Sequence, residues 1–198
     1  KLIERTYYLE QLKSVQQTPD IKVITGVRRS GKSKLLISFI DWINKNNDNV
    51  NVVYINMQET ENEPLLEYHA LHNFILEKYD AKKDNYLFID EVQLCNQFEK
   101  AINSIHTKEI FDIYVTGSNA FLLSSDLATL FTGRTFIIEV YPFSFKKFLL
   151  YFNRIDYDQA FNDYLKIGGF AGAYLYKDLE QKYNYLQRDV YETIVTRD

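Results

Sequence analysis

Four residues at fixed spacing are suited to bind a phosphate group: Gly26, Gly31, Lys32 and Ser33. They match the pattern G-x-x-x-x-G-K-[ST], in which glycines let backbone N–H groups surround an anion, the lysine reaches the β- and γ-phosphates, and the serine hydroxyl binds Mg²⁺. The alternative is a chance match in an ordinary turn. An apolar run before the motif and an amphipathic run after it favour phosphate binding, because the motif requires a strand and then a helix.

Four more polar residues lie in or directly after this loop and complete the candidate phosphate-binding set: Arg28, Arg29, Ser30 and Lys34. For Arg28 and Arg29, two interpretations stay open. They either hold the loop as solvated or salt-bridged side chains, or one of them contacts a phosphate or a partner.

An acidic pair, Asp90 and Glu91, ends the apolar run YLFI. Ligands of open α/β sheets bind at the carboxyl ends of the strands, which is where this pair is expected. Asp90 is then a candidate to hold Mg²⁺ through water, and Glu91 to orient and deprotonate an attacking water. Many strands end in an acid without a catalytic role, but a preceding phosphate loop favours the catalytic interpretation.

Polar residues also follow the fourth expected strand. Ser118 or Asn119 is a candidate to hydrogen-bond the γ-phosphate or the attacking water. The alternative is a helix cap or a turn, because serine and asparagine favour both.

Arg134 precedes the fifth expected strand and is a candidate to contact a γ-phosphate of its own or a neighbouring subunit. It would enter that strand at its N-terminal end, whereas phosphates bind at C-terminal ends, so action on a neighbouring subunit is favoured. A surface arginine without this role is the alternative.

Alternating apolar runs define the elements that must position these residues. Strands are expected at 21–25, 50–57, 85–92, 111–117 and 135–140. Helices are expected at 34–45, 64–79, 97–108 and 124–131, and the pattern is helical after Pro142. Alternation of strands and helices predicts the α/β class with a parallel sheet. We expect an α/β core over residues 1–142 and a small helical part over 143–198.

Composition limits the classes of partner. The chain has 198 residues, 46% of them hydrophobic, and a net charge of -4, which disfavours constitutive binding to nucleic acid. One cysteine excludes a disulfide within the chain. No apolar run approaches the length of a membrane span, so we expect no membrane partner and, by default, a cytoplasmic location. The helix-like C-terminal residues suggest a domain taken from a longer protein.

Several runs, read in order, resemble one family: ITGVRRSGKSKLL, FIDEVQ, VTGSNAFLLSS, TGRTFIIEVYPFSF and IGGFAGAY, with RD at the end. The sequence resembles the AAA-type P-loop ATPases of archaea and bacteria that are related to the STAND class of signalling NTPases and carry a C-terminal domain of unknown function. The double arginine inside the loop is more specific to this family than the general phosphate-binding pattern.

The resemblance implies an AAA-type core of about five parallel strands sandwiched by helices, followed by a helical lid, with ATP and Mg²⁺ bound. It implies that Glu91 is the catalytic glutamate, that Ser118, or less favourably Asn119, is the sensor, that Arg134 is an arginine finger, and that Arg5 lies near the adenine. It also implies a further C-terminal region, with a winged helix and a nuclease-like domain as candidates, through which alone nucleic acid would be contacted.

Three features depart from the family pattern or leave it open. Lys34 replaces the usual threonine, and Ala171 stands where a proline is expected. Arg188 and Arg197 are both candidates for the sensor arginine of the lid.

Two functions remain in view. The first is a Mg²⁺-dependent ATPase that drives a regulatory or mechanical change, with a homo-oligomer in the ATP state and an unknown protein partner. The second is a nucleotide-gated switch or scaffold with slow turnover. A DNA-directed motor finds little support, because no basic stripe with interleaved aromatic residues is present.

Overall fold

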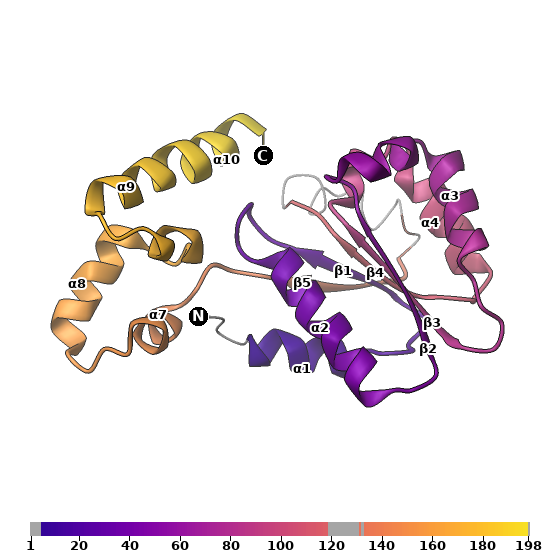
Figure 1. Cartoon of the computed structure of the whole chain (residues 1–198), viewed down its shortest axis with the longest axis horizontal. Helices are drawn as coiled ribbons and strands as arrows, with labels where there is room; N and C mark the ends of the chain where they lie inside the picture. The colour runs from indigo at the N-terminus through magenta and orange to yellow at the C-terminus, as the bar shows by residue number, and fades with distance from the viewer. Residues whose placement is uncertain (1–4, 119–130, 132, 198) are drawn as a thin grey trace.

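The computed structural model describes residues 5–118, 131 and 133–197 (Figure 1). Within them, one sheet holds five strands in the order β2-β3-β4-β1-β5, and every pairing is parallel. The strands are β1 (Ile21–Thr25), β2 (Val50–Asn56), β3 (Asp84–Asp90), β4 (Asp112–Thr116) and β5 (Thr135–Glu139). The predicted α/β class with a parallel sheet flanked by helices is confirmed.

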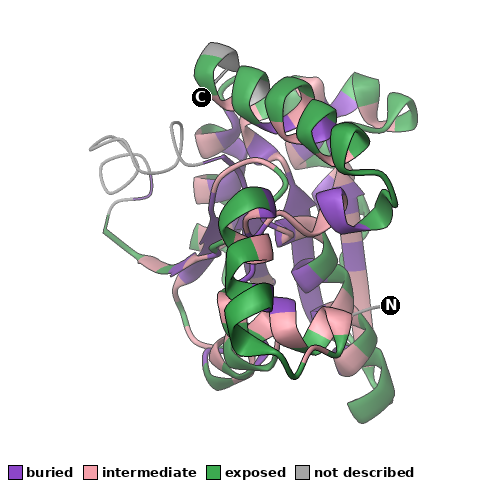
Figure 2. Ribbon diagram, turned by 90° about the vertical axis from the view of Figure 1, so that its left-hand side faces the viewer, coloured by how far each residue is buried: buried purple, intermediate pink, exposed green. Residues whose placement is uncertain are grey.

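Helices cover both faces of the sheet, so the central strands are buried over nearly their whole length, including a few polar residues such as Lys22 and Asp90 (Figure 2). One face packs against α3 (Tyr68–Glu77) and α4 (Phe98–Thr107) through residues such as Val23, Leu87 and Val115. The other face packs against α1 (Thr6–Ser14) and α2 (Lys32–Asn46) through the alternate residues Ile24, Phe88 and Tyr114. This alternation follows from the two-residue period of a strand.

Two expected elements begin or end differently in the structure. The helix expected from Pro64 was wrong at its start, because Pro64 lies in the 3₁₀ turn Thr60–Leu66 and the extended Glu67 separates this turn from α3. The strand expected to reach Val92 ends at Asp90, because Glu91 adopts a left-handed conformation (φ 56°). Nearly all of the helix expected at 124–131 lies outside the described residues.

The C-terminal helices lie on one side of the sheet, next to its β1–β5 end in Figure 1. They are α7 (Phe145–Phe152), α8 (Tyr157–Ile167), α9 (Leu179–Asn184) and α10 (Glu192–Arg197), with a 3₁₀ turn at Ala171–Leu175 and a π-helical segment at Tyr185–Tyr191. They share an aromatic cluster of their own around Phe148, Tyr174 and Tyr185. Asp156 and Asp178 cap α8 and α9 by accepting backbone N–H groups.

In the part of the chain that the structure describes, every helix is too short or too polar to cross a membrane.

Candidate functional site

The loop between β1 and α2 needs glycine at two positions and is closed by the side chain of Lys32. Gly26 has φ 151°, and a Cβ there would lie 2.3 Å from the carbonyl oxygen of Val140. Gly31 has φ 100°, a left-handed conformation that glycine adopts without strain. Lys32 begins α2 with its side chain folded over the loop, where Nζ donates to the carbonyl oxygens of Gly26 (2.8 Å) and Val27 (3.2 Å). The carbonyl oxygens of the loop thus hold the ammonium group of Lys32 in place.

Ser30 provides a second sign of a ligand in this loop. Its hydroxyl oxygen is buried and has no hydrogen-bond partner among the described residues. Buried polar atoms are nearly always paired, and an unpaired one in a phosphate-binding loop fits a ligand contact. Arg28 is half-buried.

A cavity of about 420 Å³ brings most of the predicted residues together. From the α/β part it is lined by Leu9, Leu35 and Ser38 and by eight of the predicted candidates: Arg5, Arg29, Ser30, Gly31, Lys32, Ser33, Lys34 and Glu91. From the C-terminal part it is lined by apolar and aromatic residues that include Phe143, Tyr151, Leu175 and Tyr185. The volume lies in the range of small-molecule sites, and one wall is polar while the other is apolar.

The acidic pair is held by the neighbouring strands. Asp90 is buried and does not line the cavity. One of its carboxylate oxygens accepts a hydrogen bond from the hydroxyl of Thr116 in β4, and the other accepts one from Tyr54 in β2 (3.3 Å). Burial raises the pKa of the Tyr54 hydroxyl above its usual value, and the charge of Asp90 adds to the rise.

Glu91 lines the cavity, and both its backbone and its side chain are held in place. Its N–H donates to Oγ1 of Thr116 (3.0 Å), and its carboxylate oxygen Oε2 accepts from Nε2 of Gln93 (2.5 Å). Sequence reasoning did not select Tyr54, Gln93 or Thr116. The positions of Tyr54 and Thr116 near the ends of strands that flank β3 become a signal once the strand order is known.

Arg5 joins the loop to the chain segment that leads to the C-terminal helices. Its guanidinium donates to the carbonyl oxygens of Ser30 (2.5 Å) and Tyr141 (2.5 Å) and lies 4.6 Å from the centre of the Phe143 ring. Burial lowers the pKa of Arg5 from its usual value. The guanidinium therefore braces the wall of the cavity.

Arg29 extends from the loop to the π-helical segment. Its guanidinium lies 5.1 Å from the centre of the Tyr185 ring, and its nitrogens lie 3.4 Å from the Tyr185 hydroxyl and 3.5 Å from a carboxylate oxygen of Asp189. Its backbone is left-handed, with φ 62°. The salt-bridge interpretation of this arginine agrees with these contacts.

The remaining predicted residues lie elsewhere. Ser118 is buried just beyond β4, Asn119 lies outside the described residues, and Arg188 is exposed and does not line the cavity. The backbone of Arg197 ends α10.

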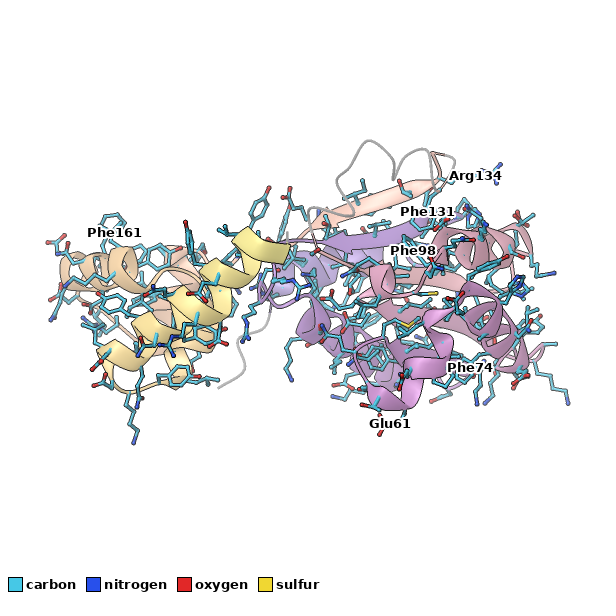
Figure 3. The ribbon with its side chains drawn as sticks, turned by 90° about the horizontal axis from the view of Figure 1, so that it is seen from above. Glu61, Phe74, Phe98, Phe131, Arg134 and Phe161 are labelled. Atoms are coloured by element: carbon cyan, nitrogen blue, oxygen red, sulfur yellow. The ribbon has the colours of Figure 1, made fainter. Side chains whose placement is uncertain are left out.

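Arg134 lies at the N-terminal end of β5, at the end of the sheet that points away from the C-terminal helices (Figure 3). Its carbonyl oxygen accepts from the N–H of Ile21 at the start of β1 (2.9 Å), and its side chain lines a different cavity of about 820 Å³ with Asp20 and Asp112. Within its own chain, Arg134 is therefore not part of the site that contains the loop.

Residues 18–149 match a family model described as an AAA domain. The chain is 37% identical over 179 residues to an uncharacterized protein of Haemophilus influenzae, covering 87% of this chain and 44% of the relative. It is 31% identical over 194 residues to the uncharacterized protein MJ1544 of Methanocaldococcus jannaschii, covering 89% of this chain and 42% of that protein. The chain thus spans less than half the length of these relatives.

The fold is similar to that of AMPPCP-bound DnaA from Aquifex aeolicus, with a TM-score of 0.54 and 16% identity over 97% of this chain and 64% of that one.

Proposed function

We propose that this chain, which belongs to the AAA domain family, binds ATP with Mg²⁺ and hydrolyses it, and that nucleotide state drives a regulatory or mechanical change. One observation carries the proposal: the phosphate loop, Glu91 and the apolar C-terminal wall line a single cavity of about 420 Å³. The AMPPCP bound to DnaA, whose fold is similar, supports a nucleotide as the ligand here.

The residues present fit a Mg²⁺ ion by their donor chemistry. Ser33 lines the cavity and has a hydroxyl oxygen, and Asp90, buried and next in sequence to the cavity residue Glu91, has a carboxylate that suits contact through water. When bound, Mg²⁺ would neutralise phosphate charge. We propose that Ser33 and Asp90 hold it.

In the proposed reaction, the oxygen of a water attacks the γ-phosphorus, and the bond between that phosphorus and the β–γ bridging oxygen breaks. The Glu91 carboxylate orients the water and accepts its proton, and ADP leaves with the bridging oxygen. Lys32 and the loop N–H groups stabilise the charge on the phosphates. Leu9, Phe143 and Leu175 supply an apolar surface for the base, with Arg5 beside it.

We further propose that residues 1–142 form the ATPase core and residues 143–198 a lid over the nucleotide. Arg134 would act on the nucleotide of a neighbouring subunit in an ATP-dependent homo-oligomer. Ser118 is the proposed sensor, since it comes two residues after Thr116, the last residue of β4. An unknown protein partner would receive the change, and any contact with nucleic acid would use regions outside this chain.

Calorimetry with ATP and Mg²⁺ tests the proposal. Lys32→Ala should abolish binding, and the control Lys45→Ala, at an exposed position in the last turn of the same helix, should not. Glu91→Gln should keep ATP bound and slow hydrolysis by about 10²- to 10⁴-fold. Wild-type protein without affinity for ATP contradicts the proposal. Tight binding with negligible wild-type turnover identifies the alternative, a nucleotide-gated switch.

A further inference from the structure

The backbone of Glu91 is held by the end of β4. The residue is left-handed, with φ 56°, and its N–H donates to Thr116, whose hydroxyl in turn donates to Asp90. These bonds determine where the Cα of Glu91 lies, but they leave the torsions of its side chain open. The position of its carboxylate therefore depends on a separate contact.

Gln93 makes that contact. Its side-chain Nε2 donates to Oε2 of Glu91 at 2.5 Å; Gln93 lies in the 3₁₀ turn Val92–Leu94, and Glu91 directly precedes that turn. The same amide has its oxygen Oε1 buried, with no hydrogen-bond partner in the part of the chain that the structure describes. Gln93 does not itself line the cavity, whereas Glu91 does.

The turn does not depend on this side chain for its shape. Backbone bonds from Leu94 to Glu91 (3.0 Å) and from Cys95 to Val92 (3.1 Å) already close it. A buried carbonyl oxygen without a donor is destabilising, so stability alone favours an apolar residue at position 93. The glutamine therefore has a use that offsets this penalty.

We propose that Gln93 is a positioning residue for Glu91. Its amide group holds Oε2, and this leaves Oε1 of Glu91 directed at the attacking water. A neutral amide donor suits the role, because it fixes the carboxylate without replacing it as proton acceptor. The expected effect on rate rests on the proposed hydrolysis. The contact between the two side chains depends only on their geometry.

Kinetics test the consequence. Gln93→Leu should lower the single-turnover hydrolysis rate by about tenfold or more, while the Kd for ATP with Mg²⁺ changes less than about twofold. Gln93→Glu keeps the shape of the side chain but places a carboxylate against Glu91, so its hydrolysis rate should also be low. This variant replaces Gln93→Leu in the test if the leucine variant fails to fold. The control Gln97→Leu makes the same change at an exposed position in the same segment and should keep the wild-type rate.

A double variant separates positioning from a general loss of structure. In the Glu91→Gln background there is no proton acceptor to orient, so adding Gln93→Leu should change the residual rate by less than about twofold. A wild-type rate in Gln93→Leu overturns the proposal. A full tenfold loss that persists in the Glu91→Gln background overturns it as well.

NMR tests the contact without relying on turnover. The side-chain ¹H–¹⁵N signals of Gln93 are identified by their loss in Gln93→Leu. They should shift in Glu91→Ala, while those of Gln97 stay in place. If the Gln93 signals do not respond to Glu91→Ala, the inference is wrong even in an active enzyme. If the wild-type protein does not hydrolyse ATP, the proposed function fails, and these signals still decide whether Gln93 holds Glu91.

Discussion

At the scale of single residues, the site depends on hydrogen bonds that join three strands. Tyr54, Asp90 and Thr116 lie at or near the ends of β2, β3 and β4, and both carboxylate oxygens of Asp90 are engaged by hydroxyl groups of the other two. These contacts fix the carboxylate that we propose to face Mg²⁺. They also make the stability of the sheet depend on the protonation of Tyr54.

Tyr54→Phe should make the free energy of unfolding decrease less steeply as the pH rises in the alkaline range. An unfolded tyrosine loses its proton near pH 10, whereas the raised pKa of folded Tyr54 keeps it protonated to higher pH. The contribution of Tyr54 to the free energy of unfolding is therefore complete below about pH 10 and is lost as the pH rises above it. Urea unfolding from about pH 9 to 11 should show a steeper loss in the wild type than in Tyr54→Phe. Equal slopes contradict this, and Tyr7→Phe, at an exposed side chain, is the control.

At the scale of elements, the phosphate loop contacts the C-terminal helices through Arg29. The partners Tyr185 and Asp189 both belong to the π-helical segment, and such segments occur frequently at functional sites. The ion pair is half exposed, so its contribution to stability is small, about 0–1 kcal/mol. A weak contact of this kind can still bias the position of a helix.

Arg29→Ala should loosen the C-terminal helices without unfolding the sheet. Amide hydrogen exchange should become faster in Tyr185–Tyr191 and stay unchanged in β1, β3 and β4. Lys34→Ala removes an exposed cation from the start of α2 and is the comparison variant. Equal exchange in the two variants would show that Arg29 does not hold this segment.

At the scale of the whole molecule, the candidate residues lie at two opposite ends of the parallel strands. The phosphate loop and Glu91 lie at the carboxyl ends of the strands, while Arg134 precedes β5 at the other end. A single chain therefore cannot bring Arg134 to its own loop without rearranging the sheet. A role in catalysis requires a second subunit.

Mixed subunits test that role. Arg134→Ala and Lys32→Ala should each be inactive alone, because arginine fingers contribute about 10³- to 10⁵-fold in rate and the lysine is needed for binding. Their mixture should recover activity wherever an intact loop faces an intact arginine. Lys83→Ala, which removes another cation from the same cavity, should keep its activity. Normal hydrolysis by Arg134→Ala, or by a chain that stays monomeric at saturating ATP, shows that the arginine is structural.

The sequence by itself determined the features that depend on neighbouring residues. The glycine spacing of the loop, the apolar runs of the strands, and Asp90 and Glu91 at and directly after the end of β3 are local patterns. The structure has the loop and strands close to where they were expected. The expected parallel connections also predicted that Arg134 lies at the N-terminal end of β5, away from the carboxyl ends of the strands. Boundaries were less accurate at Pro64 and Glu91, because a proline is also accommodated in a 3₁₀ turn and a left-handed residue has no periodic signal.

Only the tertiary structure decided which distant residues meet. The order β2-β3-β4-β1-β5 places Tyr54 and Thr116 on either side of Asp90, and no local period encodes strand order. The segment after β5 and the C-terminal helices bring Phe143 and Tyr185 close to the loop, where Arg5 and Arg29 contact them. Burial of the aromatic cluster of the C-terminal helices selects one arrangement among many that the same sequence patterns allow, so the apolar wall of the cavity became visible only in the folded chain.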